Sequence, residues 1–191
     1  IESLQGRLGG GRIIADAVVG GIDGVWNTKV LLSDARLDQL FPQTVEPGEQ
    51  RSTGVVDASL YLKGRAGHPD DLVGVGDFRV TDGELATLPM LIAVQQLLHL
   101  SSPVVSGISF VDVDFIIRGS QATLENIVLA SGGDGDGGFS LRGSGFMDLG
   151  TMEVNARLRP RGSWPVVSDV IGLVQDQLYE FSVTGPIGEP E

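Results

Sequence analysis

Most of the chain alternates apolar and polar residues with a period of two, the pattern of a β-strand with one face buried. The alternation runs through residues 12–19, 26–32, 56–63, 77–80, 111–118, 139–149 and 152–158. It is clearest in 111–118, where four apolar residues alternate with three charged ones, namely Val111, Val113, Phe115 and Ile117 with Asp112, Asp114 and Arg118. Each stretch predicts a strand with one apolar and one polar face.

Short turn signals separate these stretches, which favours antiparallel hairpins over parallel crossovers. The signals are Gly9-Gly10-Gly11, Gly20-Gly21, Asp82-Gly83, Gly119-Ser120 and Gly150-Thr151. We therefore predict a mainly β fold, a meander of about nine strands in a curved antiparallel sheet, a groove or half-barrel with one continuous apolar side.

Two segments break the strand pattern and predict helices that pack on the concave face of this sheet. The first follows Thr87-Leu88-Pro89 and is almost wholly apolar to Leu100. The second starts near Trp164-Pro165 and has apolar residues at helical spacing to Leu178. A shorter amphipathic turn is predicted from Ala35 to Phe41.

The apolar positions of the strands and of the first helix make up the predicted apolar face. They are Val56, Ala58, Leu60, Phe78, Val80, Leu91, Val94, Leu98, Val111, Val113, Phe115, Ile117, Leu141, Met147, Val154 and Leu158. No linker divides the chain, so residues 1–191 are expected to form one domain. Since the chain opens at Ile1 with neither an initiator Met nor a signal peptide, we expect it to be a piece of a longer protein.

Charge and composition narrow the possible partners. The formal net charge of −12 argues against nucleic acid or an anionic bilayer as a surface partner. The absence of cysteine excludes a disulfide scaffold, a cysteine nucleophile and thiolate metal sites. No apolar run reaches the roughly 18 residues of a membrane helix.

Two local compositions raise the question of a metal. His68 precedes Asp70 and Asp71, but an acidic, proline-fixed surface turn explains this segment more simply than a metal site. Gly132–Gly138 approaches a calcium-binding nonapeptide with Gly137 in place of the expected aspartate. It also contains Gly-x-Gly-x-x-Gly, yet a strand follows where a dinucleotide site needs a helix. We interpret it as a hairpin loop, with a weak calcium site as the alternative, and expect no metal and no cofactor.

No nucleophile elbow, phosphate loop or His-Glu-x-x-His motif is present, so we expect no enzymatic activity. His99, at the end of the first predicted helix, suits capping better than catalysis. A hydrolytic or carbohydrate-active enzyme would need Asp or Glu side chains that converge in a cleft.

Phrases along nearly the whole chain resemble the C-terminal region of the AsmA-like family, which includes the TamB relatives of the bacterial envelope. They are residues 4–13 (LQGRLGGGRI), 32–40 (LSDARLDQL), 74–85 (GVGDFRVTDGEL) leading into 88–91 (LPML), 115–119 (FIIRG), 143–149 (GSGFMDL) and 183–190 (VTGPIGEP).

This resemblance implies a periplasmic module of a protein anchored in the inner membrane, with the anchor before Ile1. It implies a long β-groove, joined to adjacent β repeats of the same chain, whose apolar floor carries phospholipid acyl chains toward the outer membrane. No catalytic residue belongs to that picture.

The function we expect is therefore a non-enzymatic envelope module that binds or transfers phospholipid between membranes in outer-membrane biogenesis. A sheet with one uninterrupted apolar face removes the cost of exposing methylenes to water, about 0.8 kcal/mol each. The alternative is a structural or protein-interaction β module, in which the two helices fill the concave face and no lipid binds.

Overall fold

The alternating stretches form the strands of a single antiparallel sheet in the computed structural model, which describes residues 2–20, 23–40, 52–84, 108–131, 140–161 and 181–186. The strands are β1 (Glu2–Leu8), β2 (Gly11–Val19), β3 (Val25–Arg36), β4 (Thr53–Arg65), β5 (His68–Glu84), β6 (Ile108–Arg118), β7 (Gln121–Ser131), β8 (Ser140–Asp148), β9 (Glu153–Arg161) and β10 (Phe181–Pro186).

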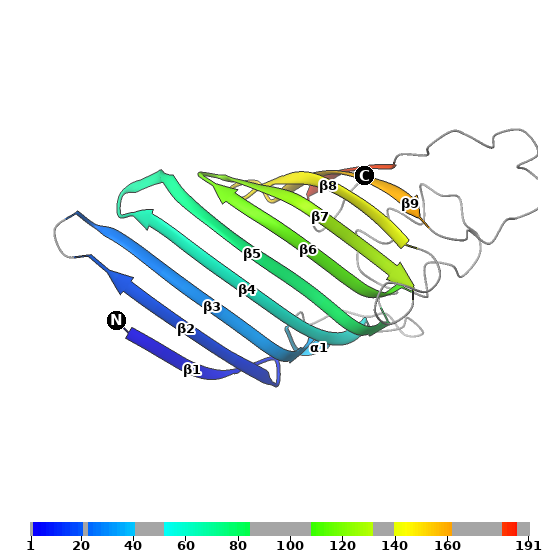
Figure 1. The fold of residues 1–191 in the computed structure, drawn as a ribbon, viewed down its shortest axis with the longest axis horizontal. Helices are drawn as coiled ribbons and strands as arrows, with labels where there is room; N and C mark the ends of the chain where they lie inside the picture. The colour runs from blue at the N-terminus through cyan, green and yellow to red at the C-terminus, as the bar shows by residue number, and fades with distance from the viewer. Residues whose placement is uncertain are drawn as a thin grey trace, which may run out of the picture.

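The ten strands lie side by side in the order of the chain, from β1 at one edge to β10 at the other. Figure 1 shows them as one twisted layer, with the N-terminus at the β1 edge. The sheet is open, since its two edge strands do not pair with each other. The prediction of a mainly β antiparallel meander is confirmed, with ten strands instead of about nine.

The predicted turns fall between strands, with one exception. Gly9 and Gly10 join β1 to β2 with φ of 57° and 78°, which glycine adopts without strain. Asp82-Gly83, by contrast, is not a turn, because β5 continues through it to Glu84. Asp82 has a φ of 51°, and the register with β4 shifts between Thr53 and Val55. The turn signal therefore marks a local irregularity inside a long strand.

One short helix, α1 (Leu37–Leu40), is the only helix within the described parts of the chain. It is shorter than the predicted Ala35–Phe41 segment, because Ala35 and Arg36 still belong to β3. Leu37 is buried, and Leu40 packs against the core. The two longer helices, predicted from Leu88 to Leu100 and from Trp164 to Leu178, lie outside the described residues.

Among the residues that the structure describes, no helix combines the length and the apolar character needed to cross a bilayer.

Candidate functional site: the apolar face of the sheet

The strand register joins the apolar positions into one face. Phe78 in β5 lies directly opposite Ala58 in β4 and Val113 in β6. Val113 in turn lies opposite Ile127 in β7. Because directly opposed residues of an antiparallel pair project from the same side of the sheet, the apolar side chains of successive strands form one surface.

The same register places every described residue of the predicted apolar face on this side. They are Val56, Ala58, Leu60, Phe78, Val80, Val111, Val113, Phe115, Ile117, Leu141, Met147, Val154 and Leu158. Leu91, Val94 and Leu98 lie outside the described residues. The apolar face that alternation predicts is therefore a continuous strip from β4 to β9. Strands β2 and β3 extend this strip through pairs such as Ala15 with Val30.

Irregularities in the register keep the strip continuous where simple alternation would break it. In β3 the register shifts between Leu32 and Ala35, which places both on the apolar side although they are three residues apart. Asp34 takes a φ of 56° there, and its backbone N–H donates to Asp57 Oδ1 at 3.1 Å. One extra residue thus reverses the parity, as a β-bulge does.

A second register shift explains why part of the apolar face was not predicted from the sequence. In β7 the register jumps between Leu124 and Ile127, so the apolar-side residues change from even to odd numbers. The residues of this strand that face the apolar side and were not predicted are Ala122, Leu124, Ile127 and Leu129. The change of parity across Glu125 and Asn126 is the signal that would have found them.

The apolar face has two regions that differ in burial. In the buried region, side chains have at most 1% of their surface exposed; its larger members include Val56, Val80, Leu129, Leu141, Leu158 and Val183. In the open region, side chains on the same face are partly exposed; it comprises Ile13, Ala15, Val30, Leu60, Leu62 and Phe115. Exposure rises to 66% at Leu4 in β1 and 75% at Val19 in β2.

Two glycines shape the floor of the open region. A Cβ added at Gly76 would lie 2.5 Å from Phe115 Cζ, and one at Gly74 would lie 2.6 Å from Leu62 Cδ2. Both distances are far below a normal contact, so the neighbouring side chains occupy the space above the glycines. The Phe115 ring therefore extends over β5 and covers its backbone with apolar surface.

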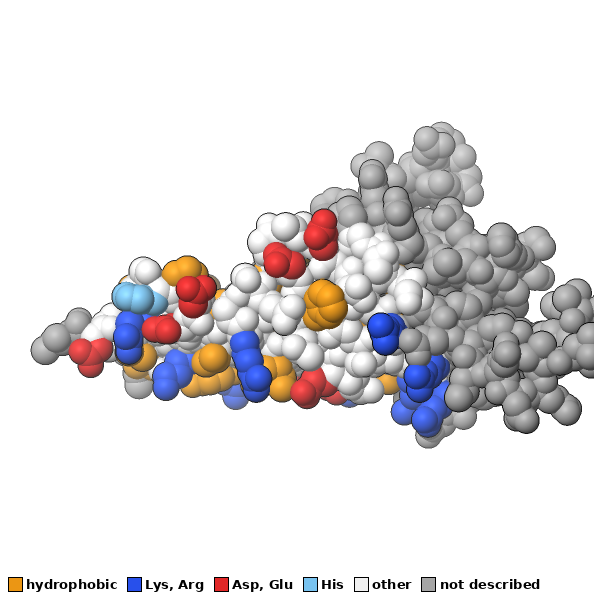
Figure 2. All heavy atoms as spheres, turned by 90° about the horizontal axis from the view of Figure 1, so that it is seen from above, with side chains coloured by type: hydrophobic (Ala, Val, Ile, Leu, Met, Phe, Trp, Pro, Cys, Tyr) orange, Lys and Arg blue, Asp and Glu red, His pale blue; other side chains and the backbone are white. Residues whose placement is uncertain are grey.

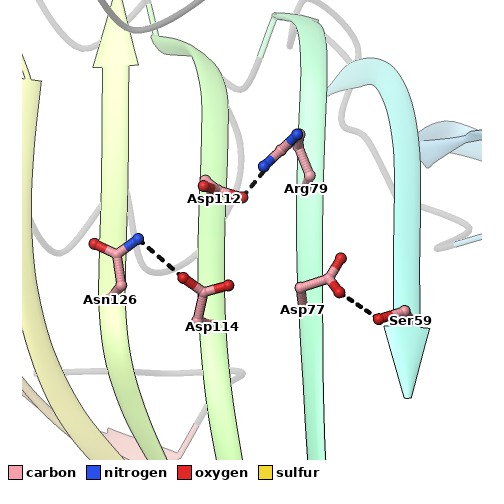
Figure 3. Close-up of polar contacts among 6 residues, drawn as sticks. All are labelled: Ser59, Asp77, Arg79, Asp112, Asp114 and Asn126. Carbon is pink, nitrogen blue, oxygen red and sulfur yellow. Dashed lines mark hydrogen bonds and ion pairs between the residues drawn. The ribbon is translucent and has the colours of Figure 1, made fainter. Parts of the chain in front are cut away.

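The opposite side, here called the polar face, carries short ladders of polar contacts (Figure 3). Arg79 Nε donates to Asp112 Oδ1 at 3.0 Å, and Asn126 Nδ2 donates to Asp114 Oδ2 at 3.1 Å. The Ser59 hydroxyl donates to Asp77. The hydrogen bond and the charge of Asp112 raise the pKa of Arg79 above its ordinary value. These contacts are typical of cross-strand pairs on a solvated face.

A hollow of about 350 Å³ on this face is lined by three acidic residues, Asp77, Asp114 and Glu125, together with Lys29 and apolar side chains such as Val75 and Ile116. Asp77 and Asp114 are directly opposed in the register. Figure 3 shows the Asp77 carboxylate turned toward Ser59 and one oxygen of Asp114 bonded to Asn126, so the two carboxylates are held by different partners. An acid–base pair needs two groups aimed at one substrate, so this geometry does not support catalysis by the two aspartates.

The metal candidates find no support among the described residues. His68 begins β5 at an exposed position, and its Nδ1 lies 3.1 Å from the carbonyl oxygen of Ala66. In the described ranges there is no group of three His, Asp or Glu side chains that suits a metal ion. Gly132–Gly138 and His99 lie outside these ranges.

Comparisons with known proteins leave the resemblance to the AsmA-like family untested. No family model, curated protein or solved structure matches the chain.

Proposed function

We propose that the chain is a non-enzymatic, lipid-handling module of the bacterial envelope, which holds phospholipid acyl chains against the apolar face of its sheet. The observation that carries the proposal is the continuity of this face across strands that pair only in sequence order. The resemblance to AsmA-like proteins supports the same function, and it implies a periplasmic module of a protein anchored in the inner membrane.

The dimensions of the face suit an acyl chain. Strands lie about 4.8 Å apart, so the four spacings of the open region, from β2 to β6, span roughly 19 Å. One leaflet of a bilayer has a hydrocarbon depth of about 15 Å, half of the core thickness. The open region is thus somewhat longer than one acyl chain, and each methylene it covers gains about 0.8 kcal/mol relative to water.

The open region is the part of the face that suits a lipid. Its side chains are partly exposed, whereas those of the buried region have no surface left to offer. Val30, Leu60 and Phe115 lie in one row across the strands, with Gly76 between Leu60 and Phe115, so this row is apolar from β3 to β6. Acyl chains need an apolar surface and no specific polar contacts, so the partly exposed apolar side chains of this region support the proposal.

Two neighbouring residues of β4 provide a matched test. Leu60 faces the apolar side, and Tyr61 faces the polar side with 43% of its surface exposed. Protein purified without detergent from a bacterial envelope fraction is analysed for phospholipid by mass spectrometry. We expect co-purified phospholipid with the unchanged chain and with Tyr61→Asp, and its loss with Leu60→Asp.

Far-UV circular dichroism establishes that both variants keep the sheet. Lipid-free protein in repeated preparations, together with no uptake of a fluorescent acyl-chain probe, would contradict the proposal. Equal loss of lipid in the two variants would also contradict it, because the polar face has no part in the proposed binding.

The second candidate function is a protein-interaction module that pairs through an edge of the sheet. Residues 3–8 of β1 are all exposed, and within the described ranges β1 pairs only with β2. Its apolar-side positions Leu4, Gly6 and Leu8 carry none of the charges or prolines that protect edge strands. Size-exclusion chromatography tests this function: self-association that Leu4→Lys removes, without a change in bound lipid, would favour it.

A further inference from the structure

The open region has one closed and one accessible end along the strands. At the end next to α1, Ala35 and Val56 are fully buried, and so is Leu37 of the helix. At the other end, beside the β2–β3 turn, Val19 is 75% exposed and lies directly opposite Trp26. Figure 1 shows α1 and this turn at opposite ends of β3. A ligand with an apolar and a polar end therefore finds water for its polar end on the Trp26 side and not on the α1 side.

An apolar path, here called the β3–β4 track, joins the two ends. It consists of three directly opposed pairs that follow one another from Trp26 toward α1, namely Thr28 with Leu62, Val30 with Leu60 and Leu32 with Ala58. All six side chains are partly exposed. The six residue steps from Trp26 to Leu32 span roughly 20 Å, compared with about 15 Å for the hydrocarbon depth of one leaflet. The track is thus long enough for one acyl chain.

The surroundings of the β3–β4 track favour a chain that runs along the strands. The hydroxyl of Thr28 already donates to the backbone oxygen of Asp16 at 3.0 Å, so it brings no unpaired donor into the track. Across the strands, the Phe115 ring occupies the space above Gly76 in β5. A flexible chain therefore has its free course along β3 and β4.

Trp26 places an amphipathic ring at the accessible end of the track. A Cβ added at Gly64, its partner in β4, would lie 2.8 Å from Trp26 Cζ2 and 3.3 Å from Nε1, so the indole lies over the β4 backbone. Trp26 makes no hydrogen bond within the described part of the chain, where no buried side-chain nitrogen lacks a partner. The indole N–H is therefore accessible and free to donate. Tryptophan is enriched where hydrocarbon meets water, because its ring is apolar and its N–H is a donor.

The surface beyond Trp26 is polar. Arg65, opposite Val25 at the start of β3, has 51% of its side chain exposed and pairs with Asp71 at 3.7 Å. His68 begins β5 at an exposed position. Figure 2 shows charged and histidine side chains gathered on the left of the view, where this end of the sheet lies. A polar headgroup stays hydrated there.

We propose that Trp26 fixes the direction of the bound phospholipid. The indole N–H donates to an ester carbonyl oxygen of the lipid, and one acyl chain runs along the β3–β4 track toward α1. The opposite direction would press the headgroup against Ala35 and Val56 and remove its water, which is costly for a charged group. This orientation rests on the proposed function, since it presupposes a phospholipid on the apolar face.

Quenching of tryptophan fluorescence by brominated lipid tests the direction. Trp164, outside the described residues, is replaced by Phe, so that Trp26 is the only tryptophan of the full chain. The protein is loaded from vesicles of phosphatidylcholine that is brominated either near the ester or near the methyl end of an acyl chain, and is then separated from the vesicles. Because bromine quenches tryptophan on contact, we expect the bromines near the ester to quench Trp26 more strongly.

A second reporter at the far end of the track is the matched control. The fluorescence that Leu32→Trp adds to this chain, with Trp26 retained, should be quenched in the reverse order. The same order at both positions, or equal quenching by the two lipids, would overturn the proposed direction and leave lipid binding intact. Loss of all retained lipid in the unchanged chain would overturn both the direction and the proposed function.

The role of the indole N–H has its own test. Diether phosphatidylcholine lacks the ester carbonyl oxygen, so the unchanged chain should bind it about two- to tenfold more weakly than the diester lipid, the share of one hydrogen bond. Trp26→Phe should lose this preference. Tyr61→Phe, which removes a donor from an exposed ring on the polar face, should keep it.

Circular dichroism establishes that these variants keep the sheet. Equal binding of the diester and diether lipids to the unchanged chain would overturn the role of Trp26, as would a preference that survives Trp26→Phe.

Discussion

The buried and open regions of the apolar face are built from the same alternating pattern, yet they differ in exposure. Val80 is 1% exposed and Leu141 is fully buried, while Leu60 and Phe115 on the same face keep part of their surface accessible. Alternation decides to which side a residue points, because the period of a strand is two. It does not determine whether other residues cover that side, and so it does not determine how exposed each side chain is. The buried region therefore stabilises the fold, and the open region is where a ligand gains contact area.

Truncation of one leucine in each region should separate these roles most strongly. Leu141→Ala removes a side chain with no exposed surface, so we expect a loss of about 3 kcal/mol in the free energy of unfolding. Leu60→Ala should lose about 1 kcal/mol, since its side chain is already partly hydrated. Urea denaturation measures both values, and equal losses would contradict the division into two regions.

A smaller loss of stability is expected from a substitution at Gly76, in the floor of the open region. Gly76→Ala places a Cβ 2.5 Å from Phe115 Cζ and 2.6 Å from the backbone oxygen of Ser59. The ring and the strand must shift, which costs roughly 1–2 kcal/mol. In the control Gly6→Ala, the new Cβ lies 3.6 Å from Ile13 Cγ2, an ordinary contact. If thermal unfolding finds both variants equally stable, Phe115 does not lie over Gly76 as described.

Substitutions on the polar face, on the other side of the sheet from both regions, should change the free energy of unfolding only weakly. Asp112→Asn leaves the Arg79 guanidinium without its charged partner. Since 52% of the Arg79 side chain is exposed, we expect a loss of only about 0.2–1 kcal/mol that vanishes in high salt. Urea denaturation at two salt concentrations tests this, and a loss as large as that of Leu141→Ala would place the pair in the core of the fold.

The β8–β9 turn, which leads into the buried region, should add a pH dependence. The backbone N–H groups of Thr151 and Gly150 donate to Asp148 and lower its pKa below the ordinary value. The lowered pKa means that ionised Asp148 stabilises the fold above the unfolded-state pKa of about 3.9, and that this contribution disappears as the pH falls through the folded pKa. NMR titration of the carboxyl carbon should give a midpoint below that of an unfolded peptide. In Asp148→Asn the acid-dependent loss should be smaller, and an unchanged pH profile would contradict the assignment.

Sequence patterns predicted the strands and their facing residues well where alternation is regular, as from Val111 to Ile117. They failed where the backbone departs from a simple strand. Asp82-Gly83 has turn composition, but the residues before and after it, Thr81 and Glu84, both pair with β4 and keep it inside β5. In β7, the shift before Ile127 and the burial of Val128 on the opposite side obscure the period.

The functional part of the prediction depends on features that alternation does not contain. The burial of the two regions follows from the three-dimensional surroundings of each strand, and the cross-strand neighbours of a charged side chain follow from the pairing, as between β8 and β9. Arg142 and Arg159 are 17 positions apart in the sequence, and only the register makes them neighbours. Net charge averages over such clusters, so it describes the chain and not its surfaces.

The order of the strands in the sheet has a consequence for how such a protein changes over generations. Every strand in the described part of the chain pairs only with its neighbours in sequence, without crossovers. Gene duplication or loss of one hairpin therefore leaves every other pairing and both faces intact, provided that whole hairpins are gained or lost. The apolar face can thus lengthen or shorten in steps of about 10 Å while its side chains stay on the same side of the sheet.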